Sequence, residues 1–97
     1  MKQKPLEKIF NIKNKNILLT GSAGRIGEHF AHILSQNGAN VILVDIDAKK
    51  NKKLETTLKN LYNTTPLSIN ADISSESDVK TMIKIILKKF KTKMLQR

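Results

Sequence analysis

The sequence contains no cysteine, no tryptophan and only one tyrosine among its 97 residues. Without cysteine, both a disulfide framework and a thiolate zinc site are excluded. Long apolar runs are also missing, and none reaches the roughly 20 residues of a membrane-spanning helix. The basic residues at positions 1–8 are not followed by an apolar signal core with a cleavage site. These absences favour a cytoplasmic protein with no membrane partner.

The scarcity of aromatic residues and of arginine also bears on the positive charge of the chain. The formal net charge of +10 would suit a nucleic-acid surface. The basic residues are almost all lysines, however, whereas arginine is the usual choice for bidentate contacts to bases and phosphates. Few aromatic rings are available for stacking on bases. We therefore expect a solvated lysine surface and no nucleic-acid partner.

Short apolar runs alternate with segments of helical spacing along the chain. The runs at residues 17–19, 41–44 and 67–71 predict three strands, and the segment after each one predicts a helix. Such an alternation indicates parallel strands joined by right-handed crossovers. The sequence therefore predicts an α/β fold of the Rossmann type, β-α-β-α-β-α, with a three-stranded parallel half-sheet, as in a truncated doubly wound fold.

The predicted helices have recognisable ends and apolar faces. Asn37-Gly38 ends the first helix and Asp47 caps the second. Ser75 and Asp78 have the spacing of a capping box that opens the third. The topology places the first two helices on one face of the sheet and the third on the other. Their apolar faces are Ile26, Phe30, Ile33 and Leu34 in the first helix, Leu54, Leu58 and Leu61 in the second, and Val79, Met82, Ile83, Ile86, Leu87 and Phe90 in the third.

A glycine-rich motif, Thr-Gly-Ser-Ala-Gly-Arg-Ile-Gly at residues 20–27, lies between the first strand and the first helix. Gly21 permits the tight turn, Gly24 lets the backbone approach a phosphate, and Gly27 lets the helix pack close to the strand. The N–H groups and dipole of the helix N-terminus then face a pyrophosphate, and Ser22 is expected to orient a phosphate. The alternative is a glycine-rich turn without a ligand. The residues expected to bind the pyrophosphate of a dinucleotide are Gly21, Ser22, Ala23, Gly24, Arg25, Ile26 and Gly27.

An acidic residue ends the second predicted strand, eighteen positions after the last glycine of the motif. A carboxylate near this spacing binds the adenosine ribose hydroxyls and repels the 2′-phosphate of NADP. Asp45 and the adjacent Ile46 are therefore expected at the cofactor, which we expect to be NAD. Arg25, Lys49 and Lys50 favour NADP instead, since a nearby cation would hold the phosphate, but solvated lysines act weakly. The alternative for Asp45 is a polar residue that merely ends the strand.

These residues resemble the short-chain dehydrogenase/reductase family, whose glycine motif opens with Thr-Gly as Thr20-Gly21 does. The glycine spacing is typical of the extended branch of the family, whereas the main branch usually has glycine where this chain has Arg25. Main-branch members with arginine there are also familiar, so the resemblance leaves both branches open. Family members also carry an aspartate after the third strand, which meets the adenine amino group. Asp72-Ile73 is similar to that element. The resemblance implies an NAD(P)-dependent oxidoreductase and covers nearly the whole chain.

The catalytic residues of the family have no counterpart in this sequence. The family uses an asparagine, a serine and a Tyr-x-x-x-Lys pair, but the only tyrosine is Tyr62 and Pro66 stands four places later. The resemblance thus implies the adenosine side of the cofactor site alone, in a truncated chain that is inactive by itself. An unpaired sheet edge favours self-association. The expected parts are a basic N-terminal arm, a partial NAD(P)-binding domain and a polar tail, at residues 1–15, 16–90 and 91–97.

Two further features bear on function. His29 and His32 lie off the apolar face of the first helix, without the spacing of a metal site, and are expected at the surface or its boundary. The alternative to an oxidoreductase fragment is a non-catalytic nucleotide-binding or interaction module that functions as a stand-alone half-domain. The substrate is left open, because its contacts come from the other half of such enzymes.

Overall fold

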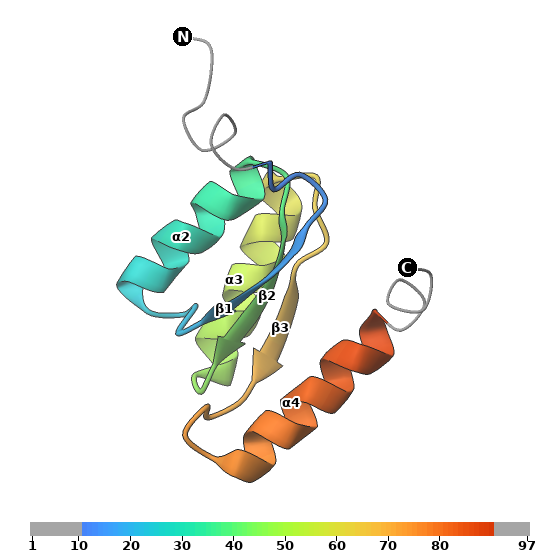
Figure 1. Ribbon diagram of the computed structural model, residues 1–97. Helices are drawn as coiled ribbons and strands as arrows, with labels where there is room; N and C mark the ends of the chain where they lie inside the picture. The colour runs from blue at the N-terminus through green and yellow to red at the C-terminus, as the bar shows by residue number, and fades with distance from the viewer. Residues whose placement is uncertain (1–10, 91–97) are drawn as a thin grey trace, which may run out of the picture.

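A computed structural model describes residues 11–90, in which three strands and three helices alternate along the chain (Figure 1). The three strands are parallel and lie in the order β1-β2-β3. This arrangement confirms the predicted Rossmann-type half-sheet. The elements are β1 (Asn16–Thr20), α2 (Arg25–Gln36), β2 (Asn40–Asp45), α3 (Ala48–Leu61), β3 (Leu67–Asn70) and α4 (Glu76–Lys89).

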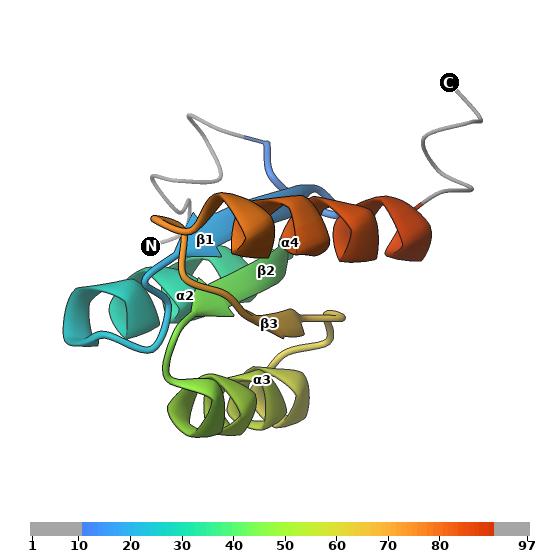
Figure 2. The same ribbon diagram turned by 90° about the horizontal axis from the view of Figure 1, so that it is seen from below.

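The sheet has helices on both faces, with α2 and α3 on one side and α4 on the other, as the topology predicted (Figure 2). The central strand β2 therefore supplies side chains to two separate hydrophobic clusters. Val41 and Leu43 pack with α2 and α3, whereas Ile42 and Val44 pack with β3 and α4. This two-sided cover explains why β2 reads as an uninterrupted apolar run.

The face that α2 turns toward the sheet differs from the predicted one. Ile26, Phe30 and Ile33 are 72%, 53% and 45% exposed, respectively, while Ala31 and Ser35 are buried. Gly27 sets this orientation, because it brings the first turn of α2 against the backbone of the preceding loop. Small side chains then follow at intervals of four and form the close contact with the sheet. Three residues of the predicted apolar face are therefore left at the surface, whereas the fourth, Leu34, packs against the core as predicted.

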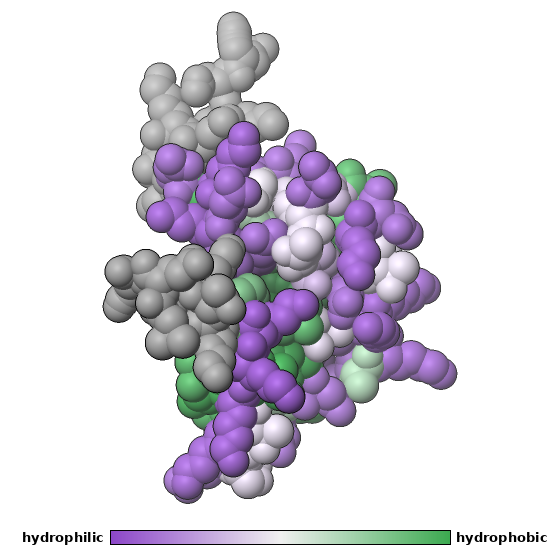
Figure 3. Space-filling model, turned by 90° about the vertical axis from the view of Figure 1, so that its right-hand side faces the viewer, coloured by the Kyte–Doolittle hydropathy of each residue, from purple (hydrophilic) through white to green (hydrophobic). Residues whose placement is uncertain are grey.

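The inner face of α4 is narrower than predicted. Met82 is buried, and Val79, Ile86 and Phe90 pack around it, but Ile83 and Leu87 are each nearly half exposed. The helix lies over β2 and β3 and leaves β1 uncovered on this side, where Leu18 is 46% exposed. Figure 3 shows hydrophilic side chains over most of the visible surface, with a hydrophobic area among them.

The predicted caps of α3 and α4 are present. Asp47 accepts a hydrogen bond from the backbone N–H of Lys50 at 3.0 Å, and Ser75 Oγ accepts one from Asp78 at 3.3 Å. The capping box at α4 is only half formed, because the Asp78 carboxylate accepts its hydrogen bond from the N–H of Asp72 at 2.9 Å. Asp78 thereby ties α4 to the loop that follows β3.

Candidate functional site

The glycine-rich loop between β1 and α2 is anchored to the end of β2. Gly21 has φ +70°, a left-handed conformation that favours glycine. The N–H groups of Gly21 and Ser22 both donate to the carbonyl of Val44, at 2.8 and 3.3 Å. The next N–H, that of Ala23, donates to Asp45 Oδ2 at 2.9 Å. The first three residues of the loop are therefore held by the strand that carries the predicted ribose-binding acid.

The other two glycines of the motif have different structural requirements. A Cβ at Gly27 would lie 2.0 Å from the Gly21 carbonyl oxygen, so only glycine fits there. A Cβ at Gly24 would lie 3.4 Å from the same oxygen, which is an ordinary contact. The close approach of α2 to the loop thus requires Gly27, as the sequence predicted. Nothing in the fold itself demands glycine at position 24, which is exposed.

The N-terminus of α2 differs from those of α3 and α4. Its N-cap residue is Gly24, which has no side chain to accept a hydrogen bond, whereas Asp47 and Ser75 cap the other two helices. The first-turn N–H groups of a helix have no acceptor within the helix. At Arg25, Ile26 and Gly27 these groups are available to an anion, and the helix dipole adds to the attraction.

The Asp45 carboxylate is fixed beside this helix end. Its Oδ2 accepts from Ala23, and its Oδ1 accepts from the N–H of Asp47 at 2.8 Å. Each carboxylate oxygen has a second lone pair, so both oxygens can also accept from a ligand hydroxyl. Asp45 is half-buried, and its side chain is therefore both held in place and open to solvent on one side.

One hollow of about 220 Å³ brings together the three parts of the chain that the sequence singled out. Parallel strands end at the same edge of a sheet, and the residues after β1, β2 and β3 meet there. Ile46 and Ile73 are 68% and 56% exposed and give the hollow an apolar lining. The lining residues are Gly21, Val44, Asp45, Ile46, Ala71, Asp72 and Ile73.

Asp72 is held in a local turn at this hollow. Its Oδ1 accepts from the side-chain hydroxyl of Ser74 at 2.6 Å and from the backbone N–H of Ser74 at 2.9 Å. These two hydrogen bonds, that from the hydroxyl first, lower the pKa of Asp72 below its usual value. The carboxylate is exposed and charged at neutral pH, and its other oxygen is free of the turn.

The side chain of Ser22 does not lie where the sequence predicted. It is fully buried, and its Oγ donates to Asn51 Oδ1 at 2.6 Å instead of facing a phosphate. Asn51, in the first turns of α3, was not predicted as a site residue. The available signal was its spacing, because position 51 lies on the same helix face as Leu54 and Leu58. A polar residue on a buried helix face needs a partner.

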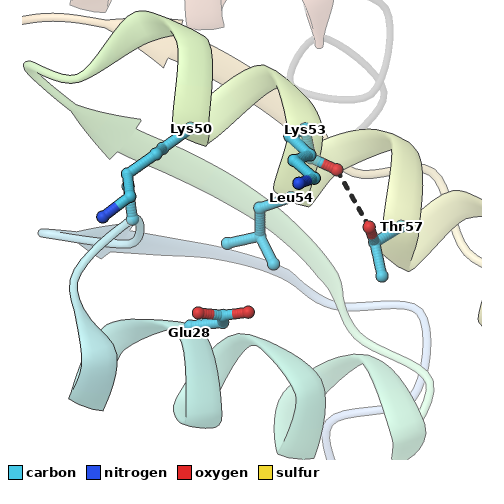
Figure 4. Close-up of a pocket in the computed structure, with 6 residues that line it drawn as sticks. Glu28, Lys50, Lys53, Leu54 and Thr57 are labelled. Atoms are coloured by element: carbon cyan, nitrogen blue, oxygen red, sulfur yellow. Dashed lines mark hydrogen bonds between the residues drawn. The ribbon is translucent and has the colours of Figure 1, made fainter.

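A second hollow, of about 230 Å³, lies between α2 and α3 (Figure 4). Glu28 from α2 points toward α3, whose residues form the opposite wall. Of the predicted cofactor-binding residues, only Ala23 reaches it. This hollow is therefore separate from the sheet edge where the predicted residues meet. Its lining residues are Ala23, Glu28, Lys50, Lys53, Leu54 and Thr57.

The remaining candidate residues lie away from the sheet edge. Tyr62 follows α3 and lies toward the opposite end of the sheet, where its hydroxyl is 2.9 Å from His32 Nδ1. His32 is half-buried and His29 is exposed, in agreement with their expected positions.

Within residues 11–90, no cluster of three or more histidine, aspartate or glutamate side chains has the arrangement of a metal site. No helix in this part of the chain is long and apolar enough to span a membrane.

Comparison with known proteins places this geometry in a family. The chain is 36% identical over 70 residues to a short-chain dehydrogenase/reductase of Botryotinia fuckeliana, covering 72% of this chain and 27% of that protein. It is similar in structure to 3-ketoacyl-(acyl-carrier-protein) reductase of Brucella melitensis complexed with NADH, with 30% identity, a TM-score of 0.73, and coverage of 81% and 31%. The fold is also that of L-sorbose reductase of Gluconobacter frateurii complexed with NADPH, with 23% identity, a TM-score of 0.78, and coverage of 81% and 30%.

The chain spans between about a quarter and a half of the length of the curated relatives that it matches, from 27% to 47%. The match to the family model nevertheless extends over residues 15–94 of the 97. It therefore includes all three sequence elements that meet at the sheet edge. This chain belongs to the short-chain dehydrogenase family.

Proposed function

We propose that this chain binds the adenosine and pyrophosphate part of NAD and forms the cofactor-binding portion of a short-chain dehydrogenase/reductase. The observation that carries the proposal is the single hollow that joins Gly21, Asp45 and Asp72, which come from three different strand ends. Gly21 begins the loop that leads to the proposed pyrophosphate site, Asp45 is suited to the ribose hydroxyls, and Asp72 is suited to the adenine amino group. Their convergence gives a binding site for a whole adenosine diphosphate moiety.

The pyrophosphate would be held by the N-terminus of α2. The uncapped N–H groups of residues 25–27 supply hydrogen-bond donors, and exposed Gly24 leaves the approach free of a Cβ. The adenosine would occupy the adjacent hollow. Ile46 and Ile73 offer apolar surface to the adenine ring, and the Asp72 carboxylate would accept from its amino group.

Asp45 supports NAD over NADP in this proposal. Its carboxylate is fixed at the end of β2 by hydrogen bonds from Ala23 and Asp47. A negative charge in that place accepts from the ribose hydroxyls and repels a 2′-phosphate. Lys49 and Lys50 are exposed, so water and salt screen them more strongly than the fixed carboxylate.

The oxidoreductase activity of a protein built on this site is also part of the proposal. The cofactor supplies hydride transfer when bound, and the residues of this chain bind and orient its adenosine half. The Tyr-x-x-x-Lys pair of the family does not occur in the 97 residues. Among the described residues, nothing favours the alternative of a stand-alone interaction module. We therefore propose cofactor binding without turnover for this chain by itself.

The test is a titration of the purified chain with NAD, NADP, ADP and nicotinamide mononucleotide, followed by calorimetry. We expect ADP to bind nearly as well as NAD, because the proposed contacts all lie in the adenosine diphosphate half. NADP should bind more weakly than NAD, and nicotinamide mononucleotide should not bind. Tighter binding of NADP than of NAD would reject the cofactor assignment. Absence of any binding by NAD and ADP would reject the proposal as a whole.

We also propose that the chain, studied alone, self-associates beside β1. Among residues 11–90, β1 pairs with a strand on one edge only. Exposed apolar side chains occur on both sides of the sheet, with Leu18 on the strand itself and Ile26, Phe30 and Ile33 on α2, which contacts β1. An exposed strand edge with apolar neighbours favours pairing with a second copy.

A further inference from the structure

A buried pair of polar side chains connects the glycine-rich loop to α3. Ser22 is fully buried and Asn51 is 1% exposed. The Ser22 hydroxyl donates to Asn51 Oδ1 at 2.6 Å, across 29 positions of sequence. The hydrogen bond of the Ser22 backbone N–H is longer, at 3.3 Å to the Val44 carbonyl. The side chain, more than the backbone, therefore holds Ser22 in place.

The amide of Asn51 also reaches the sheet. Its Nδ2 donates to the carbonyl of Leu43 in β2 at 2.8 Å and to that of Ile69 in β3 at 3.4 Å. Asn51 thus joins the loop, two strands and its own helix through one side chain. Both side chains are buried, so removing either one leaves one polar atom of the other, Ser22 Oγ or Asn51 Oδ1, without its hydrogen bond.

The Ser22–Asn51 hydrogen bond affects the glycine-rich loop because Ser22 lies in its middle. On one side is Gly21 in a left-handed conformation, and on the other is Ala23, whose N–H donates to Asp45. Glycines make the loop free to adopt several backbone conformations. A fixed hydrogen bond at Ser22 selects one of them. The selected conformation leads directly into the N-terminus of α2.

We propose that Asn51, acting through Ser22, is a positioning residue for pyrophosphate binding. It lies behind the loop, contacts no ligand itself, and holds the backbone so that the N–H groups of residues 25–27 face the pyrophosphate. The inference rests on the proposed function, since it assigns a role within that same site. It assigns the role to the pyrophosphate end alone, because the adenosine hollow is lined by other residues.

The experiment compares ADP with adenosine, which lacks the pyrophosphate, in Ser22→Ala, Asn51→Ala and the double variant. Each single change is expected to weaken ADP and NAD binding about tenfold, which corresponds to loss of one buried hydrogen bond. Adenosine binding should change by less than about threefold. The double variant should lose little more ADP affinity than either single one, because each single change already removes the Ser22–Asn51 hydrogen bond that holds the loop. Equal weakening of ADP and adenosine, or no weakening of either, would overturn the proposal.

A second variant separates positioning from stability. Combining Ser22→Ala with Asn51→Leu replaces both polar groups by apolar ones of similar size, which restores much of the stability. Its ADP binding should remain weak, although its resistance to urea approaches that of the wild type. Glu55→Gln is the matched control, because Glu55 is also buried in α3 but bonds to Ser68 in β3. It should lower stability without changing the ratio of ADP to adenosine affinity.

Hydrogen exchange of the ligand-free chain tests the positioning role of Asn51 separately from the proposed binding of NAD. The Ala23 N–H is bonded to Asp45, so its exchange rate reports the order of the loop. In Asn51→Ala this amide should exchange at least about tenfold faster, relative to amides in β2. Unchanged exchange at Ala23 would overturn the positioning role even if NAD binds. If Ala23 exchanges faster in Asn51→Ala but the wild-type chain does not bind ADP, the proposed function is rejected. Asn51 would then only order the loop, which also overturns its role in pyrophosphate binding.

Discussion

The Asp45 carboxylate accepts a hydrogen bond from the Ala23 N–H at 2.9 Å, although 22 positions separate the two residues. The acid that is expected to distinguish NAD from NADP is therefore part of the support of the phosphate-binding loop. A change at Asp45 acts on both the ribose and the pyrophosphate end of the site. Deleting the Asp45 side chain therefore alters ribose binding and pyrophosphate binding together.

We expect Asp45→Ala to weaken NAD binding more than about tenfold, since it removes the ribose acceptor and releases the Ala23 N–H. NADP binding should weaken less, because the repulsion of its 2′-phosphate is lost as well. Titration of both dinucleotides measures the ratio. Glu76→Ala is the control, because it removes the same charge at an exposed position outside the site. An unchanged NAD-to-NADP ratio in Asp45→Ala would contradict the assignment.

Alanine substitutions at Gly24 and Gly27 should separate binding from folding. Gly27→Ala places a Cβ 2.0 Å from the Gly21 oxygen and should cost about 3 kcal/mol of stability or more. Gly24→Ala meets that oxygen at 3.4 Å, so the fold should survive while NAD binding falls. Urea denaturation and NAD titration of both variants measure the two effects. A Gly24→Ala variant with wild-type affinity would show that the pyrophosphate does not approach this residue.

Glu55 should make stability depend on pH. Burial raises its pKa, but hydrogen bonds from the Ser68 hydroxyl and N–H and the charge of Lys52 together outweigh burial and lower it. Because the pKa in the folded state is below the usual 4.5, this group stabilises the fold above that pH. The stabilisation is lost as the pH falls below 4.5 and through the folded-state pKa.

The measurement is urea denaturation between neutral pH and pH about 3. The loss of stability on acidification should be smaller in Glu55→Gln than in the wild type. Glu76→Gln serves as the comparison, since it removes an exposed carboxylate whose ion pair with Lys80 contributes little. Identical pH profiles of Glu55→Gln and the wild type would show that Glu55 does not carry this dependence.

The isolated 97-residue chain should not catalyse dehydrogenation. Its only tyrosine lies toward the opposite end of the sheet from the glycine-rich loop and contacts His32. Neither proton transfer nor positioning of a reacting carbon is then available. The assay follows NADH formation with a panel of alcohols, and a Tyr62→Phe variant controls for trace activity. Sustained NADH production that Tyr62→Phe abolishes would prove this expectation wrong.

Association of the isolated chain should depend on the edge of β1. Leu18→Lys places a charge on that edge and should shift the chain toward the monomer in light scattering. Leu61→Lys, which changes a more exposed leucine on α3 (62% against 46% for Leu18), should leave the association unchanged. A wild-type monomer with a sharp, reversible transition well above about 50 °C would contradict the expected association and low stability.

Much of the fold was predictable because local signals are strong here. The apolar runs, Asp47 and Ser75 locate the strands and helix starts, and strand-end residues in a parallel sheet have one place to meet. The face of α2 was not predictable from periodicity. Helix α2 carries a stripe of small residues beside a stripe of large apolar residues, and both have the same spacing. The contact of Gly27 with Gly21 turns the stripe of small residues toward the sheet. The Ser22–Asn51 bond depends on tertiary packing, which the spacing of α3 alone does not specify.

The two hydrophobic clusters on opposite faces of β2 share no residue, which divides the cooperativity of this domain. Helices α2 and α3 pack together in one cluster, whereas α4 packs in the other without a second helix of the described chain. Helix α4 also supplies the Asp78 carboxylate that accepts from the N–H of Asp72. Partial unfolding of α4 can therefore occur while α2, α3 and the glycine-rich loop keep their packing. Such an opening would loosen the adenine end of the hollow and leave the pyrophosphate end intact. The two ends of one binding site then open at different free energies, and bound adenosine would slow the exchange of α4 amides most.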